Sequence, residues 1–159
     1  MKKLMIWALA SCLAACSSID CPVQNVVSVQ YAIFNSDGTE LSLRDTLTIS
    51  SKRNDGSDTI LLNRLVSKNS FSLPVSYSHP EDILLFTFSK DSVILVDTVW
   101  IKKEDIPHFE SVDCSAAFFH ELTDVRYTQN AIDSLVLKNK SVNYDVSTIH
   151  LHLYPKSRN

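Results

Sequence analysis

Apolar and polar residues alternate along most of this chain, and this alternation constrains the fold more than any other feature. The pattern is clear in residues 28–33 and again in residues 71–75. Successive side chains of a strand point to opposite faces, so a period of two is typical of a half-buried β-strand. No segment longer than about 12 residues has the period of an amphipathic helix. The sequence therefore predicts an all-β protein.

The strand-like segments are short and lie about 8 to 15 residues apart, which is typical of a β-sandwich or a small barrel. We predict an immunoglobulin-like antiparallel β-sandwich of 7–9 strands, with a small lipocalin-like β-barrel as the alternative. The expected strands are residues 28–33, 46–50, 60–66, 71–75, 83–88, 93–101, 118–127, 132–137 and 146–154.

Turn residues separate several of these segments. Gly38 and Gly56 are the two glycines of the chain, and both follow an aspartate between strand-like runs, where a positive φ is easily reached. Pro74 cannot donate to a strand ladder and therefore predicts an edge strand. The apolar runs before and after residues 89–92 predict a central hairpin, and residues 106–109 are expected to break the strand pattern.

The first 16 residues have the parts of a bacterial lipoprotein signal. Two lysines precede an apolar run, and Leu13-Ala14-Ala15-Cys16 resembles a lipobox, in which the cysteine is acylated and begins the mature chain. Cys12 is the alternative processing site, but its apolar run is shorter. We therefore expect a signal peptide at residues 1–15, the lipidated cysteine and a short tether at 16–21, one β-sandwich domain at 22–155 and a tail at 156–159.

The mature chain then keeps two further cysteines, Cys21 and Cys114. An exported chain with two cysteines and no Cys-x-x-Cys spacing predicts one structural disulfide, with two buried free thiols as the alternative. Such a bond would pin the amino terminus against a late strand, which is why we prefer the sandwich to the barrel. In the chain-entropy model, closing so long a loop stabilises the fold by roughly 4 to 5 kcal/mol.

Charge excludes one class of partner. The formal net charge is −3 at pH 7, and removing Lys2 and Lys3 makes the mature chain more acidic still. Proteins that bind nucleic acid usually carry a basic patch, and none is visible here. The sequence therefore predicts no nucleic-acid partner.

The sequence also predicts no enzyme and no cofactor. A serine nucleophile elbow needs closely spaced glycines, and both glycines here belong to hairpin turns. His150 and His152 lie two residues apart in an expected strand, so both imidazoles are expected on one face, where they are the best candidate metal ligands. Two ligands do not make a site, and we interpret these histidines as part of a polar solvent face rather than a metal centre.

A triplet of Asp, then Ser or Thr, then an apolar residue recurs five times. It resembles the O-glycosylation acceptor of exported proteins of the Bacteroidota. An alternative explanation is that Asp favours turns and β-branched residues begin strands, so the triplet simply marks the start of a strand. The candidate acceptors are Thr46, Thr59, Ser92, Thr98 and Ser134.

Several of these features together resemble an uncharacterised family of small Bacteroidota outer-membrane lipoproteins. They are the Leu-Ala-Ala-Cys signal, the nearby Cys21, the segment 71–74 (Phe-Ser-Leu-Pro) and the segment 112–114 (Val-Asp-Cys). The late cysteine of that family is usually followed by glycine, whereas Ser115 follows it here. The resemblance implies an outer-membrane location and a β-rich fold, and it implies no catalytic activity.

We therefore expect a non-enzymatic, lipid-anchored binding or assembly module, and a carrier of a small apolar ligand in a barrel is the alternative. Surface-exported lipoproteins of this bacterial group tend to carry several acidic residues after the lipidated cysteine, and Ser17–Asp20 has one. The periplasmic face of the outer membrane is thus expected, with the cell surface as the alternative. The short tether spans at most roughly 17 Å. The expected partners are accordingly the membrane, through the lipid, and a protein at the membrane surface.

Overall fold

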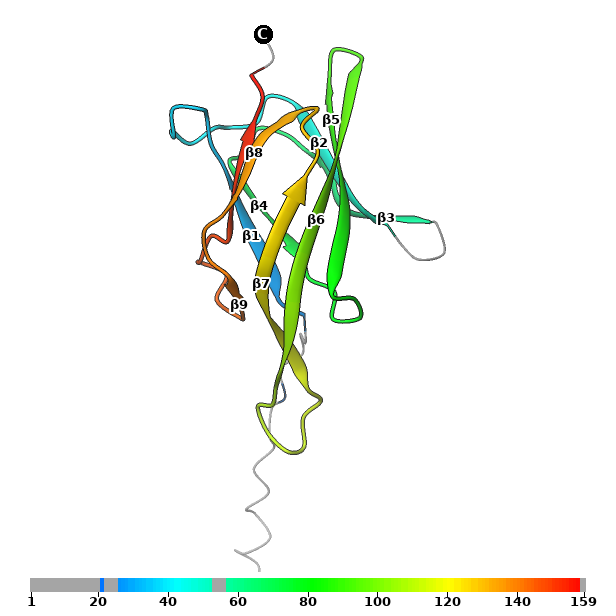
Figure 1. The fold of residues 1–159 in the computed structure, drawn as a ribbon, viewed down its shortest axis with the longest axis vertical. Helices are drawn as coiled ribbons and strands as arrows, with labels where there is room; N and C mark the ends of the chain where they lie inside the picture. Colours follow the sequence, from blue (N-terminus) through cyan, green and yellow to red (C-terminus); the bar gives the residue numbers. More distant parts are fainter. Residues whose placement is uncertain (1–20, 22–25, 53–56, 158–159) are drawn as a thin grey trace, which may run out of the picture.

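The chain folds as a β-sandwich (Figure 1). The computed structural model describes Cys21, residues 26–52 and residues 57–157, and this part of the chain contains strands and no helix. The strands are β1 (Ser28–Ile33), β2 (Thr46–Lys52), β3 (Asp58–Leu65), β4 (Ser70–Pro74), β5 (Glu81–Lys90), β6 (Val93–His108), β7 (Ala117–Tyr127), β8 (Ile132–Leu137), β9 (Ser141–Val142) and β10 (Leu151–Pro155). The all-β sandwich predicted from the sequence is confirmed.

One sheet has four strands, in the order β4-β1-β10-β8. The first and last strands, β1 and β10, are parallel neighbours, with Tyr31 opposite Leu151. Strand β4 pairs with β1 and strand β8 pairs with β10, and both of these pairs are antiparallel. The sheet is therefore mixed, and the prediction of a purely antiparallel sandwich was wrong at this pair. A parallel pair needs a long connection, and here nearly the whole domain lies between the two strands. The expected edge position of β4, with Pro74 at its end, is confirmed.

The other sheet has six strands, in the order β3-β2-β5-β6-β7-β9. Its centre is the predicted hairpin of β5 and β6, which pair from Glu81 with Lys102 to Lys90 with Val93. Asp91 and Ser92 form the turn, with φ of 46° and 66°. Two adjacent residues with positive φ give the tight turn whose twist matches that of paired strands. The turn predicted at Gly38 also has positive φ, of 83°.

The core lies between the two sheets and draws side chains from both. Tyr31 of β1 is fully buried, stacks on Phe71 of β4 at 4.6 Å between ring centroids and lies 6.1 Å from Phe86 of β5. Along β1 and β2 the inward residues alternate with half-exposed ones, as the sequence pattern predicts. Side chains of both sheets thus pack into one buried cluster within the described residues.

The structure corrects two expected strand boundaries. Strand β6 runs past Pro107 to His108, where a break was expected. This part of β6 lies beyond its pairing with β5 and pairs with β7 alone, and proline is tolerated at such a sheet edge.

The last strand, β10, begins at Leu151 and not at residue 146. Asp145 accepts hydrogen bonds from Ser147 N (2.8 Å) and Thr148 Oγ1 (2.7 Å), so the preceding residues form a polar turn.

Other expectations lie outside the described residues. These are the signal peptide at 1–15, Cys16, the rest of the tether before Cys21, the turn at residues 54–56 and the end of the tail. The described residues contain ten strands, against the predicted 7–9. The two-residue strand β9, which pairs with β7, was not expected, because so short a segment has no recognisable alternation.

Asp97 of β6 is fully buried and joins the two sheets. Its carboxylate accepts hydrogen bonds from Thr128 Oγ1 (2.7 Å) and from three backbone amides, those of Asn130 (2.7 Å), Ala131 (2.7 Å) and Ile132 (2.8 Å). These donors lie in the connection from β7 to β8 and at the first residue of β8, where the chain leaves the six-stranded sheet for the other. Burial raises the pKa of the Asp97 carboxyl, but the hydrogen bonds outweigh burial and the pKa is lowered.

We predict that Asp97→Asn lowers the free energy of unfolding by about 3 kcal/mol, because an amide cannot accept all these bonds and leaves buried amides unpaired. Urea unfolding followed by tryptophan fluorescence measures this. Because the pKa of the folded state lies below the ordinary value, the contribution of Asp97 is complete above about pH 4 and is lost as the pH falls below it. The loss of stability between pH 4 and pH 2 should therefore be smaller in the variant, and an unchanged loss contradicts the role of Asp97.

Candidate functional site

A long hairpin projects from one end of the sandwich. Beyond the pairing of Glu81 with Lys102, strands β6 and β7 continue as a ribbon from Lys103 to His120. We call residues 103–120 the arm, and Figure 1 shows it extending beyond the rest of the two sheets. Its loop carries Cys114, which forms a disulfide with Cys21 (S–S distance 2.06 Å). The predicted pairing of the two cysteines is confirmed, and it fixes the amino-terminal chain to the arm.

Two buried side chains, Lys103 and His120, hold the base of the arm through the partly exposed carboxylate of Asp105. Lys103 is 2% exposed and its ammonium group donates to the backbone carbonyl of His79 and to Asp105 Oδ1 (3.3 Å). The same oxygen lies 2.7 Å from Nδ1 of His120, which is also 2% exposed. Burial lowers the pKa of His120, and the hydrogen bond to Asp105 opposes this shift. The network ties β6 to β7 and to the loop before β5, so the arm is braced where it leaves the sheet.

Asp82 and Tyr31 extend this polar region toward the core. Burial raises the pKa of Asp82, and the charge of Lys103 offsets part of that shift. The Tyr31 hydroxyl is buried with no hydrogen-bond partner among the residues that the structure describes, and burial, followed by the nearby Asp82, raises its pKa. His120 and Asp105 have the geometry of an imidazole oriented by a carboxylate. The imidazole is nevertheless almost inaccessible, so a substrate cannot reach it and the arrangement is a structural brace.

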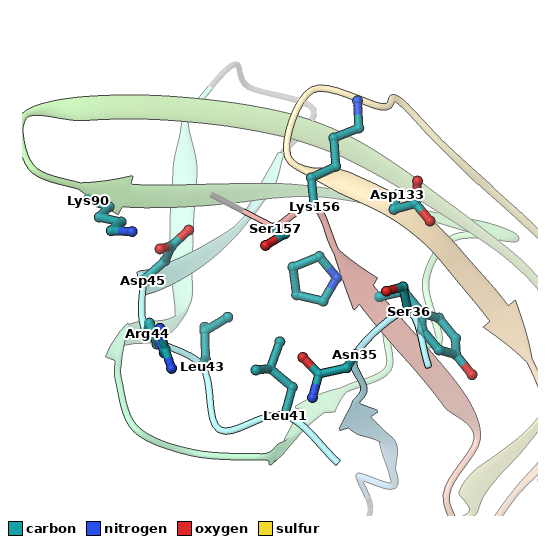
Figure 2. A pocket seen from close by; sticks show the side chains of 12 residues that line it. Asn35, Ser36, Leu41, Leu43, Arg44, Asp45, Lys90, Asp133, Lys156 and Ser157 are labelled. Carbon is teal, nitrogen blue, oxygen red and sulfur yellow. The ribbon is translucent and has the colours of Figure 1, made fainter. Parts of the chain in front are cut away.

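A pocket of about 580 Å³ lies at the opposite end of the sandwich (Figure 2). Figure 2 shows Leu41 and Leu43 pointing into it, with Asn35 and Ser36 on one side. The lining residues come from the connection between β1 and β2, from the β5–β6 hairpin, from β8 and from the end of the chain: Asn35, Ser36, Leu41, Leu43, Arg44, Asp45, Lys90, Asp133, Tyr154, Pro155, Lys156 and Ser157. The pocket thus combines apolar side chains with a polar and charged rim.

Local hydrogen bonds give the pocket fixed walls. The loop at residues 35–39 is closed by a bond from Asn35 N to the Thr39 carbonyl (2.8 Å) and by Asp37, which accepts from Thr39 N (2.9 Å). Leu43 N donates to the Lys68 carbonyl (2.9 Å), which fixes the second half of the connection. Lys156 N donates to the Ala131 carbonyl (2.7 Å), so the end of the chain is also held. A pocket with such walls is largely formed before a ligand binds.

The two candidate metal ligands do not form a site. His150 is 1% exposed, and both ring nitrogens are occupied, since Nδ1 accepts from Gln30 N (2.9 Å) and Nε2 lies 3.1 Å from the Ser141 carbonyl. His152 instead packs on Phe34, at 4.3 Å between ring centroids. The expected shared polar face was therefore wrong for His150, because this residue precedes β10 and does not follow the alternation of that strand. Within the described residues no three His, Cys, Asp or Glu side chains are grouped to hold a metal ion.

The five Asp-Ser/Thr-apolar triplets have different structural settings. Thr46 begins β2, the triplet of Thr59 begins β3, and Ser92 belongs to the turn before β6, so these three mark strand starts. Ser134 is the third residue of β8. Thr98 lies inside β6 and follows Asp97, whose carboxylate has the structural role described above. O-glycosylation at these positions stays a prediction.

Comparison with known protein families identifies the family of this chain. Residues 46–155, which are more than half of the chain, match the model of DUF6452, a family of unknown function. No curated protein and no solved structure matches the chain. Within the described residues, no helix is long and apolar enough to cross a membrane.

We predict that replacing Cys114 by Ser, or reducing the disulfide, lowers the free energy of unfolding by about 4 kcal/mol, because the unfolded chain regains the freedom of a long loop. Guanidinium unfolding with and without a reductant measures the difference. Ser111→Ala, in the same loop, is the matched control and should leave stability unchanged within about 0.5 kcal/mol. Equal stability of the oxidised and reduced proteins contradicts this role.

Proposed function

We propose that this chain, which belongs to the family of unknown function DUF6452, is a lipid-anchored, non-enzymatic binding module at the periplasmic face of the outer membrane. The amino-terminal sequence supports the anchor, since a charged start and an apolar run precede the lipobox-like Leu-Ala-Ala-Cys at residues 13–16. The single acidic residue between Cys16 and Cys21 favours the periplasmic face over the cell surface.

The disulfide supports a defined orientation of the module. Five residue steps separate Cys16 from Cys21, a reach of at most roughly 17 Å, and Cys21 is bonded to the loop of the arm. With a lipid on Cys16, the arm faces the bilayer. The β5–β6 hairpin lies at the other end of the 16-residue strand β6, about 50 Å away. The pocket, which Lys90 of that hairpin helps to line, then faces away from the membrane.

The pocket is the surface that we assign to the partner. This arrangement of two opposite ends, one tied by the disulfide and one hollowed, is the observation that carries the proposal. Loops at one end of a β-sandwich are a common place for binding sites. Leu41 and Leu43 offer an apolar floor for a side chain, and the rim offers hydrogen bonds to a backbone. A short protein segment from a neighbouring component of the envelope fits this combination.

Two observations favour a binding module over the other functions considered. The histidines most suited to acid-base chemistry, His120 and His150, are almost completely buried, so they support no reaction with an external substrate. A carrier was expected to need a closed barrel, whereas the described strands form two sheets around a packed core. We therefore propose no catalytic residues and no cofactor.

A photo-crosslinking residue at the pocket tests this function. Placed at the exposed positions Ser36 or Ser157, it should capture a discrete protein in cells, and Leu41→Asp should reduce the yield at least tenfold by placing a charge on the apolar floor. The matched control is the same residue at Ser72, which is exposed on the edge strand β4. Mass spectrometry of the purified adducts identifies what is captured.

The orientation adds a second readout to the same experiment. A long flexible insertion after Ser18 frees the domain from its fixed height above the bilayer, so capture of a membrane-attached partner should fall severalfold. Equal capture at Ser36 and Ser72, or adducts with bulk lipid alone, contradicts the proposed pocket.

A further inference from the structure

We propose that the tip of the arm enters the interfacial region of the bilayer and contacts zwitterionic phospholipid directly. This inference rests on the lipid anchor proposed above and adds a second, protein-made contact to it. Its basis is a pair of apolar side chains at the tip, Phe109 and Val112, which are 66% and 98% exposed. The same loop carries Cys114 and thus the disulfide.

The covalent path makes this tip the part of the described domain that is held closest to the anchor. Val112 lies two residues from Cys114, and Cys21 is five residue steps from the proposed lipid attachment at Cys16. A reach of at most roughly 17 Å keeps the tip beside the headgroups. Interfacial apolar side chains enter to a depth of about 5 to 10 Å, which lies within that reach. A lipid surface therefore covers the tip whenever the chain is anchored.

The arm is built to present its tip as a rigid element. It extends about 20 Å from Lys103 to the loop, and its base is braced by Asp105 and the buried His120. Aromatic contacts line both of its strands, since Phe118 stacks on Tyr77 at 5.3 Å and Phe119 stacks on His108 at 4.3 Å between ring centroids. Phe109 and Val112 at the tip are instead largely exposed within the described part of the chain, and burying them would favour association with an apolar phase.

Charge selects the kind of lipid. Between residues 104 and 125 the sequence has six acidic residues and no lysine or arginine. Glu110, beside Phe109, is paired with His108 at 3.0 Å, and Asp113 lies beside Val112. Anionic lipid repels such a tip, whereas a zwitterionic surface such as phosphatidylethanolamine does not. The arm thus differs from the basic segments that bind anionic membranes.

Tryptophan probes test the contact in the lipid-anchored mature chain. In a background in which Trp100 is replaced by Phe, one variant carries Phe109→Trp and the matched control carries Ile94→Trp, which is 64% exposed at the opposite end of β6. Vesicles of phosphatidylethanolamine and phosphatidylcholine contain brominated lipid as the quencher. We expect quenching at least fivefold stronger at position 109 than at position 94.

Flotation of the same samples separates this proposal from the anchor itself. A chain that floats with the vesicles but shows equal quenching at positions 109 and 94 overturns the tip contact and leaves the anchor standing. A chain that does not float and shows no quenching overturns both. Quenching at position 109 that appears only when membrane proteins are added also overturns the proposal, because it assigns the tip to a protein.

A second measurement uses the mature chain with Cys16→Ser, which lacks the lipid. Its weak binding to zwitterionic vesicles should fall at least fivefold in the double variant Phe109→Ser, Val112→Ser, whereas Val93→Ser, Ile94→Ser at the other end should leave binding unchanged. Replacing a third of the lipid by phosphatidylglycerol should weaken binding severalfold, and Glu110→Gln with Asp113→Asn should restore it. Equal binding of the two double variants overturns the proposal.

Discussion

The bond between Cys21 and Cys114 is the constraint on which the arrangement of this protein depends. It joins residues 93 positions apart and fixes the amino-terminal chain to the loop of the arm. Strand pairing alone leaves the position of that chain open, because β1 begins only at Ser28. The bond places Cys21 at the end of the sandwich that carries the arm, and the pocket lies at the opposite end. The orientation and the function that we propose therefore both depend on one covalent link.

Buried charges supply the second level of organisation. Asp97 holds the connection through which the chain passes from one sheet to the other, and Lys103 with Asp105 braces the base of the arm. Both clusters lie where the pairing of β6 with a neighbouring strand ends. Polar side chains there supply hydrogen-bond partners that a neighbouring strand would otherwise provide. The charges of Asp97 and Lys103 are removed from water, so they are stabilised only while their hydrogen-bond partners stay in place. The arrangement of the chain at the β7–β8 connection and at the base of the arm therefore depends on these hydrogen bonds.

The sequence predicted the local structure of the fold better than its long-range pairing. Alternation and turn residues were sufficient for the β5–β6 hairpin and for the edge strand β4, because these depend on neighbours in sequence. The parallel pairing of β1 with β10 and the burial of His150 depend on contacts between segments far apart in the sequence, so no local sequence pattern predicts them. The cysteine pair could be predicted from chemistry alone. The pocket could not, because its lining residues come from four separated segments.

In the orientation that we propose, the arm faces the bilayer and the pocket faces away from it. Energy transfer from a donor dye to acceptor-labelled lipid measures this directly in the lipid-anchored chain, with the dye on a cysteine introduced at Ile94 or at Val112 and the native disulfide kept intact. We expect strong transfer from position 112 and weak transfer from position 94, which lies about 50 Å farther along the molecule. Equal transfer from the two positions, or stronger transfer from position 94, would contradict it.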